Sequence, residues 1–267
     1  MSDPVPRDIA AALAHSAERR GCFGDPLYFF VETGSTNDVA ATLAELGAPD
    51  GATVIASSQT TGRGRFGRTW FSPEGAGLYV SVICRNPDAA PLLTLTGGVA
   101  VAHGIRAATA LPVFIKWPND VVTGDAGRAR RKLAGILAEA STGADGLQYV
   151  ILGFGINLRP AAYPPELMDR ATSIETELGR PADAGAVLAE TLAALRSLVD
   201  RLASGDREYV LAQWRDLAPS SRGATVEWTT PSGDLRGTSA GIDNDGALLV
   251  RVGARVERII SGELRWP

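Results

Sequence analysis

The residues best suited to chemistry lie in one short segment, residues 59–70, which reads Q-T-T-G-R-G-R-F-G-R-T-W. Its three glycines let the backbone approach a ligand closely. Its three arginines are charged at every working pH, so they need an anionic partner or bulk solvent. The composition therefore predicts a loop that closes over an anion such as a phosphate, above a site that the rest of the chain builds.

Two other interpretations of this loop are open at this point. Its glycines match the dinucleotide-binding pattern G-x-G-x-x-G, which requires a strand before it and a helix after it. Residues 52–56 read as the strand, but Pro73 and the apolar spacing after Trp70 argue against the helix. The second alternative is an exposed basic loop without a ligand, as many loops are.

Lysine usage points to two further positions. Of the 26 basic residues only Lys116 and Lys132 are lysines, and the other 24 are arginines. An ammonium is a compact point charge, whereas a guanidinium is a wide planar fork. Both lysines border expected strands beside turn or loop residues, so we interpret them as positions where arginine does not fit, with chance as the alternative.

Polar residues precede the first helix of the core. Ser35, Thr36 and Asn37 lie directly before an apolar helical pattern that ends at Gly47. One of the three is expected to cap this helix with its side chain. Three such groups exceed what capping needs, so the others are candidates for binding a polar ligand.

Two more clusters follow expected strands. Lys116 begins the turn sequence K-W-P-N-D, which contains Asn119. Residues 153–157 place Gly153 and Gly155 inside a strand that ends at Asn157. Glycines inside a strand indicate either close approach of a ligand or another backbone, or a β-bulge.

Other catalytic machinery is missing from the sequence. Two histidines and two cysteines give no plausible triad, no disulfide framework and no metal-ligand spacing, and no G-x-x-x-x-G-K-[ST] is present. Arginine, lysine, amides and glycine backbone remain. Such a set works by positioning reactants and neutralising charge, as in phosphoryl and nucleotidyl transfer.

The totals bound the location and the partners. A net charge of −4 argues against a general binder of nucleic acids or membranes. The N-terminus shows neither a cationic start nor an apolar run, and no stretch reaches membrane-spanning length. We therefore expect a cytoplasmic protein.

The elements that must position these residues predict an α+β fold. Consecutive strands joined by short turns favour antiparallel pairing over alternating βαβ units. Helices are expected at residues 8–20, 39–46, 91–110, 183–203 and 206–217, and strands at 27–31, 52–58, 78–84, 113–117, 120–123, 132–140 and 147–158. Short strands after Gly223 predict a small β-barrel, so we divide the chain into residues 1–221 and 222–267.

Five segments, in this order, resemble the biotin protein ligases: G-S-T-N at 34–37, the G-R-G-R-x-G-R-x-W loop at 62–70, K-W-P-N-D at 116–120, K-L-A-G-I-L at 132–137 and G-x-G-I-N at 153–157. Each motif alone is weak, and the combination is specific. The resemblance runs from about residue 27 to the C-terminus. It implies a class II synthetase-like catalytic domain, with a mixed and largely antiparallel sheet, followed by an SH3-like barrel.

The resemblance also implies a two-step reaction. The biotin carboxylate attacks the α-phosphate of MgATP, giving biotinyl-5′-AMP and pyrophosphate. A lysine amine on the biotin carboxyl carrier domain of an acyl-CoA or pyruvate carboxylase then attacks the mixed anhydride and releases AMP. The nucleophile belongs to the substrate, which explains why the chain lacks one.

Site residues follow from matching positions. Lys116, Arg65 and Arg68 would be catalytic, with Lys116 between the biotin carboxylate and the α-phosphate. The resemblance assigns biotin binding to Ser35, Thr36, Asn37, Gln59, Gly62, Arg63, Lys116, Leu133, Gly135 and Gly153. It assigns ATP or adenylate binding to Arg63, Arg65, Arg68, Trp70, Asn119, Lys132 and Asn157.

Departures and rivals remain. Only about 26 residues precede the first expected strand, too few for the DNA-binding domain of some family members, so we expect no operator binding. The Arg-rich hairpin at 124–131 looks long for the family, and the oligomeric state stays open, a homodimer included. The rivals are a lipoate ligase or octanoyltransferase of the same fold, and a non-catalytic nucleotide- or RNA-binding module.

Overall fold

The computed structural model describes residues 2–124, 130–161, 163–230, 233–262 and 264–266. Its main element is a seven-stranded sheet in the order β1-β2-β3-β7-β6-β5-β4. β1 and β2 are parallel, and every other neighbouring pair in this sheet is antiparallel. The strands are β1 (Leu27–Thr33), β2 (Thr53–Gln59), β3 (Gly77–Cys84), β4 (Phe114–Lys116), β5 (Asp120–Thr123), β6 (Arg131–Gly143) and β7 (Gly146–Asn157).

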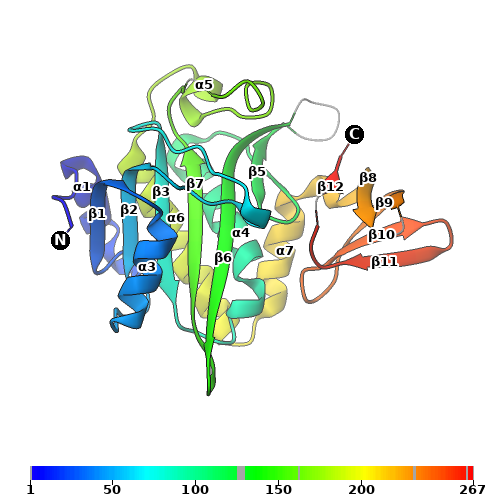
Figure 1. Ribbon diagram of the computed structural model, residues 1–267, viewed down its shortest axis with the longest axis horizontal. Coiled ribbons are helices and arrows are strands. Elements are labelled where there is room, and N and C mark those ends of the chain that lie inside the picture. Colours follow the sequence, from blue (N-terminus) through cyan, green and yellow to red (C-terminus); the bar gives the residue numbers. More distant parts are fainter. Residues whose placement is uncertain (1, 125–129, 162, 231–232, 263, 267) are drawn as a thin grey trace.

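Helices cover the two faces of this sheet unequally (Figure 1). One face packs on α4 (Leu93–Thr109), α6 (Ala184–Ala203) and α7 (Arg207–Leu217), with α1 (Arg7–His15) and α2 (Ala17–Arg20) against α6. Leucines spaced three or four residues apart along α6 form its buried stripe, as an amphipathic helix requires. On the other face, α3 (Thr36–Glu45) covers only β2, β3 and β7, so much of that face is open to a ligand.

Strand alternation separates the two faces chemically. Along β7, Val150, Leu152, Phe154 and Ile156 belong to the main hydrophobic core on the α4 side. The residues between them, including Gly153 and Gly155, point to the opposite face because side chains alternate along a strand. In the β6–β7 register Gly135 lies beside Gly155 and Leu137 beside Gly153. Three of these four residues are glycines, so few side chains project from this part of the sheet face.

A second sheet lies beside α7 and has the order β11-β10-β9-β8-β12. Its strands are β8 (Arg222–Thr230), β9 (Gly233–Ile242), β10 (Leu248–Val252), β11 (Arg255–Ile259) and β12 (Leu264–Arg265), all antiparallel to their neighbours. This small antiparallel sheet fits an SH3-like domain. The buried Trp117 links it to the main sheet, since its Nε1 donates to the carbonyl of Gly246 at 2.9 Å.

The α+β prediction is confirmed, and several details differ. The helix expected at residues 8–20 is divided at Ser16, whose hydroxyl and amide bond back to Ala12. A short helix, α5 (Ile174–Leu178), was not predicted. The division at residue 221 stays a prediction, and most of the Arg-rich tip at 124–131 and of the turn at 231–233 lies outside the described residues.

Three 3₁₀ turns complete the described elements: η1 (Arg65–Gly67), η2 (Ala90–Leu92) and η3 (Pro219–Ser221). Among the described residues, no helix combines the length and the apolar character needed to cross a bilayer.

Candidate active site

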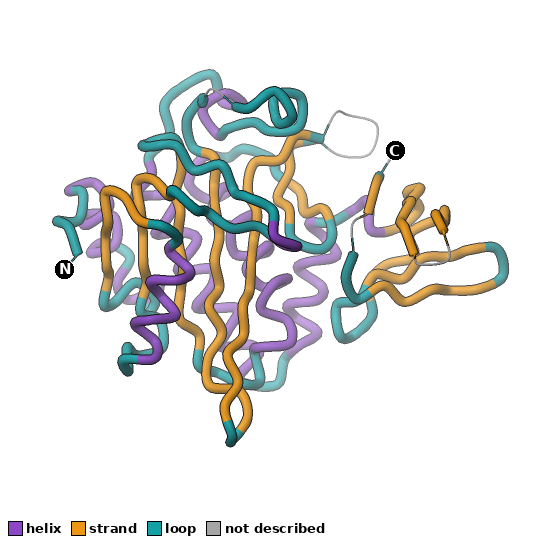
Figure 2. The backbone as a smooth tube through the Cα atoms, in the orientation of Figure 1, coloured by secondary structure: helices purple, strands orange, loops and turns teal. Residues whose placement is uncertain are grey.

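A cavity of about 880 Å³ lies on the open face of the main sheet, within the size range of small-molecule sites. Loops and strand ends converge over this face (Figure 2). The cavity is lined by every site residue that the sequence singled out, except Gly62 and Leu133: Ser35, Thr36, Asn37, Gln59, Arg63, Arg65, Arg68, Trp70, Lys116, Asn119, Lys132, Gly135, Gly153 and Asn157.

The two exceptions have structural explanations. Leu133 is fully buried in the core on the helix side of the sheet. Gly62 is buried within the loop, where a Cβ would lie 2.6 Å from the carbonyl oxygen of Trp70. Both residues are therefore buried behind the residues that line the cavity.

The loop at 59–70 is a narrow ribbon with a turn at its tip. Trp70 N donates to Gly62 O at 2.9 Å, and Gly64 N donates to Arg68 O at 2.7 Å. The tip is the 3₁₀ turn η1, in which the exposed Phe66 has a left-handed φ of 57°. A bulky residue rarely adopts this conformation, so the tip is strained in its present position.

A hydrogen-bonded chain of polar side chains forms one end of the cavity. Gln59 Oε1 accepts from the Thr36 amide at 2.9 Å and from its hydroxyl at 3.1 Å. Gln59 Nε2 donates to Ser72 Oγ at 2.9 Å, and Ser81 Oγ contacts Thr36 Oγ1 at 2.8 Å. This end offers both donors and acceptors in a buried setting.

The expectation that a side chain among residues 35–37 caps α3 is wrong. Ser35 occupies the N-cap position but makes no side-chain cap hydrogen bond. Thr36 and Asn37 are already inside the first turn, where their side chains bond across to β2, β3 and β6. All three residues line the cavity, and their use in binding a polar ligand stays a prediction.

Glycines in β7 let two side chains lie directly on the sheet. A Cβ at Gly153 would lie 2.2 Å from Asn37 Oδ1, and one at Gly155 would lie 2.3 Å from Trp70 Nε1. The irregularity in the β6–β7 ladder falls between Ser141 and Thr142, away from both. Close approach is therefore the correct alternative, and the β-bulge is not.

The two lysines lie at the other end, on either side of Asp120. Lys132 Nζ pairs with Asp120 Oδ1 at 2.6 Å and stands 5.0 Å from the centre of the Trp70 ring. Lys116 is opposite Asp120 in the β4–β5 register and has no ion-pair partner in the described parts of the chain. Burial lowers the pKa of Lys116, while Asp120 opposes that shift. Lys116 is therefore a partly desolvated cation available to an incoming anion.

Arginines extend this positive region along the loop. Arg65 is partly buried and stacks on Phe66, with its guanidinium carbon 4.9 Å from the ring centre. Burial lowers the pKa of Arg65, although a guanidinium remains charged. Arg63 is turned the other way and forms ion pairs with Asp38 and Glu139 at 2.8 Å each.

Two asparagine side chains, those of Asn119 and Asn157, also line the cavity. Asn119 Nδ2 donates to Ile136 O at 2.8 Å, and Asn157 Nδ2 donates to Thr172 O at 3.0 Å. Each amide therefore uses one donor to hold a neighbouring strand or loop. Their remaining polar atoms can serve a ligand.

Sequence reasoning missed a segment that also lines the cavity. Residues 158–172 contribute Tyr163, Leu167 and Arg170 to the cavity lining. The segment is held by backbone hydrogen bonds to both sides of Lys132, from Lys132 N to Arg170 O at 2.7 Å and from Thr172 N to Lys132 O at 3.0 Å. No periodic pattern marks these residues, so only the position after the G-I-N motif could have drawn attention to them.

The second sheet also contributes to the lining, through Glu227, Leu264, Arg265 and Trp266. This contribution was not predicted either. Among the described residues no group of three or more His, Cys, Asp or Glu side chains could hold a metal ion. The cavity thus combines hydrogen-bonding groups at one end with a cluster of positive side chains at the other, an arrangement suited to a polyanionic ligand beside a smaller polar one.

Comparisons with known proteins agree with this geometry. Residues 30–157 match the model of the Biotin/lipoate A/B protein ligase family, and residues 223–264 match that of the Biotin protein ligase C terminal domain. The Biotin--[acetyl-CoA-carboxylase] ligase of Mycobacterium tuberculosis is 34% identical over 252 residues, covering 87% of this chain and 86% of that protein. The chain belongs to the biotin protein ligase family.

Other similar proteins extend the comparison. The Bifunctional ligase/repressor BirA of Bacillus subtilis is 34% identical over 247 residues, covering 90% of this chain and 74% of that protein. The biotin protein ligase of Aquifex aeolicus, solved in complex with biotin and ATP, has a TM-score of 0.76 and 28% identity, covering 90% of this chain and 99% of that one.

Proposed function

We infer that this chain is a biotin protein ligase, which activates biotin with ATP and transfers it to a lysine of a biotin carboxyl carrier domain. The observation that carries the inference is the cavity itself. It has hydrogen-bonding side chains at one end and two lysines at the other, with ATP- and biotin-bound relatives of the same fold. A protein that supplies no nucleophile fits a reaction in which both nucleophiles come from substrates.

The polar end suits the ureido ring of biotin. A buried urea needs both donors and acceptors, because each unpaired group costs about 1–3 kcal/mol. Ser35, Thr36 and Asn37, at the start of α3, supply such groups, with Gln59 across from them. Gly135 and Gly153 leave room for the bicyclic ring on the flat sheet face.

The positive end suits the reacting carboxylate and phosphate. In the first step a carboxylate oxygen forms a bond to the α-phosphorus, and the bond from that phosphorus to the bridging oxygen breaks as pyrophosphate leaves. Both partners are anions, so the ammonium of Lys116 reduces their repulsion and stabilises the charge of the transition state. Lys132, tethered by Asp120, contacts the adenylate side.

The loop and the covering segment hold the intermediate. All five side chains involved line the cavity: in this proposal Arg65 and Arg68 bind the phosphates, and Trp70, Asn119 and Asn157 bind the adenylate. Closure of such a loop excludes water, which would otherwise hydrolyse the mixed anhydride. In the second step the carrier amine bonds to the acyl carbon, the acyl–oxygen bond to phosphate breaks, and the amine loses a proton as AMP leaves.

Magnesium enters as part of the MgATP substrate. Mg²⁺ is commonly held by substrate phosphates with one or two carboxylates. The lining offers only Asp120 and Glu227 among the described residues, and Asp120 already pairs with Lys132. The chain's residues therefore fit a nucleotide-borne ion and supply no metal cage of their own.

Three further proposals concern the protein as a whole. We place it in the cytoplasm, which suits its use of ATP and its free cysteines Cys22 and Cys84. We propose that it binds no operator DNA, given its net charge of −4, and that homodimers can form through the edge strands β1 or β4. Fluorescence anisotropy with promoter DNA and light scattering test these two statements.

The activity test uses the protein, MgATP and a purified biotin carrier domain with biotin, lipoate or octanoate. We expect mass spectrometry to find biotin on the carrier lysine and no label from the two fatty acids. Labelling by lipoate or octanoate in place of biotin would instead identify a lipoate ligase or an octanoyltransferase and overturn the proposal.

A further inference from the structure

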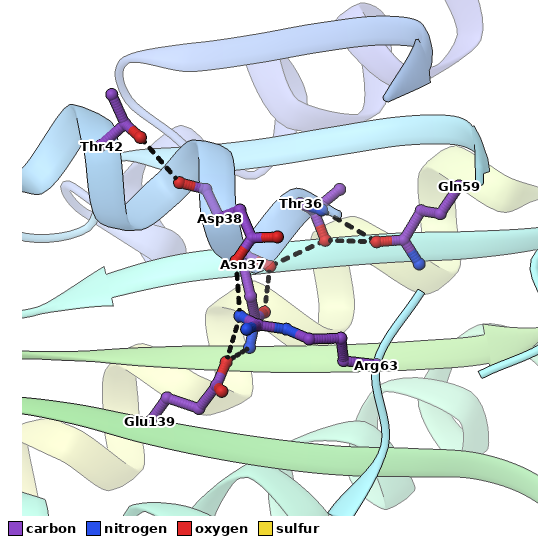
Figure 3. Close-up of polar contacts among 8 residues, drawn as sticks. Thr36, Asn37, Asp38, Thr42, Gln59, Arg63 and Glu139 are labelled. Carbon is purple, nitrogen blue, oxygen red and sulfur yellow. Dashed lines mark hydrogen bonds and ion pairs between the residues drawn. The ribbon is translucent and has the colours of Figure 1, made fainter. Parts of the chain in front are cut away.

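Arg63, at the base of the 59–70 loop, is fixed by two carboxylates from different parts of the scaffold (Figure 3). Its Nη2 lies 2.8 Å from Asp38 Oδ1 on α3 and 2.8 Å from Glu139 Oε2 on β6. The same Glu139 oxygen accepts a hydrogen bond from Asn37 Nδ2 at 2.5 Å. One carboxylate therefore holds both a loop residue and a cavity residue.

Glu139 is placed for this task by strand alternation. It lies on the open face of β6, two residues beyond Leu137 and four beyond Gly135, both of which line the cavity. Glu139 itself is not a lining residue, so it lies just past the end of the cavity that contains Asn37 and Gly153. From there Glu139 holds the Asn37 side chain, which lies beside Gly153, and the Arg63 guanidinium at the same end of the cavity.

A chain of further contacts links Asn37 to Ser72, just after the end of the 59–70 loop. Ser81 Oγ contacts Asn37 Oδ1 at 2.5 Å and Thr36 Oγ1 at 2.8 Å. Thr36 donates to Gln59, and Gln59 donates to Ser72, which follows the loop. The base of the ribbon is thus held on both sides, and the tip at 65–67 takes no part in this network.

We propose that Glu139 and Asp38 form an acid clamp, a pair of positioning residues that fixes Arg63 and Asn37 so that the biotin end of the cavity is formed before biotin arrives. The proposal rests on the proposed function. A preformed site binds more tightly because fewer side chains must be ordered on binding. The clamp also divides the loop into two parts. The base at Arg63 is fixed before biotin binds, and the tip at residues 65–67 is free to change position when the adenylate forms.

The division predicts a selective effect. Glu139→Gln removes the charge that holds Arg63 and weakens the bond to Asn37, so two side chains must be ordered by biotin instead. We expect the KM for biotin to rise about tenfold. The KM for ATP and the kcat at saturating biotin should stay within about twofold, because the lysines and the tip are untouched. Asp38→Asn should act in the same direction and more weakly.

A matched control breaks a comparable ion pair elsewhere. Glu190 on α6 binds Arg19 through two hydrogen bonds of 2.6 and 2.7 Å, on the helical side of the sheet. Glu190→Gln should leave all kinetic constants unchanged. The double variant Glu139→Gln/Arg63→Gln should lose less biotin affinity than the sum of the two single losses, since both substitutions remove the same Arg63–Glu139 contact.

A second measurement needs no biotin activity. Trypsin cleavage after Arg63, followed by mass spectrometry, should be slow in the parent chain and at least several-fold faster in Glu139→Gln. Unchanged cleavage, an unchanged KM for biotin, or equal rises in the KM for biotin and ATP would overturn the clamp. A parent chain that fails to biotinylate while this cleavage difference persists would instead overturn the proposed function.

Discussion

Replacing Gly155 with alanine tests whether the position of Trp70 on the sheet matters for catalysis. The added methyl carbon would lie 2.3 Å from Nε1 and 2.5 Å from Cε2 of the indole. Favourable contacts lie at about 3.5–4.0 Å, so the ring must move by roughly 1 Å or more. β7 is flanked by β3 and β6 in the middle of the sheet, so the loop residue yields and the strand does not.

The displaced ring has two consequences. The ring moves away from the Lys132 ammonium, which loses a cation–π interaction worth about 0.5–2 kcal/mol, and the cavity wall that Trp70 forms is displaced. A misplacement of about 1 Å near reacting groups can cost on the order of 100-fold in rate. We therefore expect Gly155→Ala to lower kcat/KM for ATP about 100-fold, and to lower the free energy of unfolding by only about 1 kcal/mol.

The assay is the initial rate of biotin-dependent pyrophosphate release against ATP concentration, with thermal unfolding measured in parallel. Gly98→Ala is the matched control. Its new methyl would lie 3.6 Å from Ile115, an ordinary contact, and alanine favours the interior of α4 by up to about 1 kcal/mol. Its activity should equal that of the parent chain and its stability should not fall.

Two results would refute the reasoning. One is an unchanged kcat/KM for ATP in Gly155→Ala. The other is a further 100-fold loss when Gly155→Ala is added to Trp70→Ala, because without the indole the methyl has nothing to displace.

Three further substitutions test other parts of the site. Lys116→Arg should reduce adenylate formation at least tenfold despite the retained charge; parent-like activity, or a loss confined to Lys132→Arg, would remove Lys116 from its assigned role. Because burial lowers the pKa of Lys116, the adenylation rate of the parent should fall as pH rises through a value below the ordinary lysine pKa, and a rate that stays flat until the ordinary value would contradict this. Trp117→Phe, which loses the bond to Gly246, should lower kcat several-fold, whereas Trp214→Phe, whose indole N–H has no partner among the described residues, should not. Arg65→Ala should release biotinyl-AMP, seen as biotinylation of added bystander proteins, and an adenylate held as firmly as in the parent would argue against a lid.

Local pattern accounts for much of the fold and the site. Alternation and turn residues located the strands of the main sheet, and the two lysines stood out by composition alone. Gly153 and Gly155 were expected to permit close approach of a ligand or another backbone, and in the structure it is two side chains that lie close to them. Their partners, Asn37 and Trp70, could not be predicted, because they depend on how α3 and the loop lie across the sheet.

Other features depended on long-range contacts. Glu139 reads from the sequence as an ordinary strand residue, and its role follows from the position of Arg63, 76 residues away. Residues 158–172 have no periodicity and are ordered by backbone bonds to Lys132 and by Asn157. Thr36 and Asn37 likewise depend on distant partners: they lie inside the first turn of α3 and bond to Gln59 and Glu139.

The most direct test of the central claim separates the two steps. The protein is incubated with biotin and MgATP without carrier, passed through a desalting column to remove free ATP, and then mixed with a biotin carrier domain. If the cavity holds biotinyl-5′-AMP under its loop, the carrier lysine becomes labelled in one burst that does not exceed one biotin per active site, and AMP is released in equal amount. Carrier labelling that requires fresh ATP after desalting, with no adenylate retained by the protein, would contradict the account.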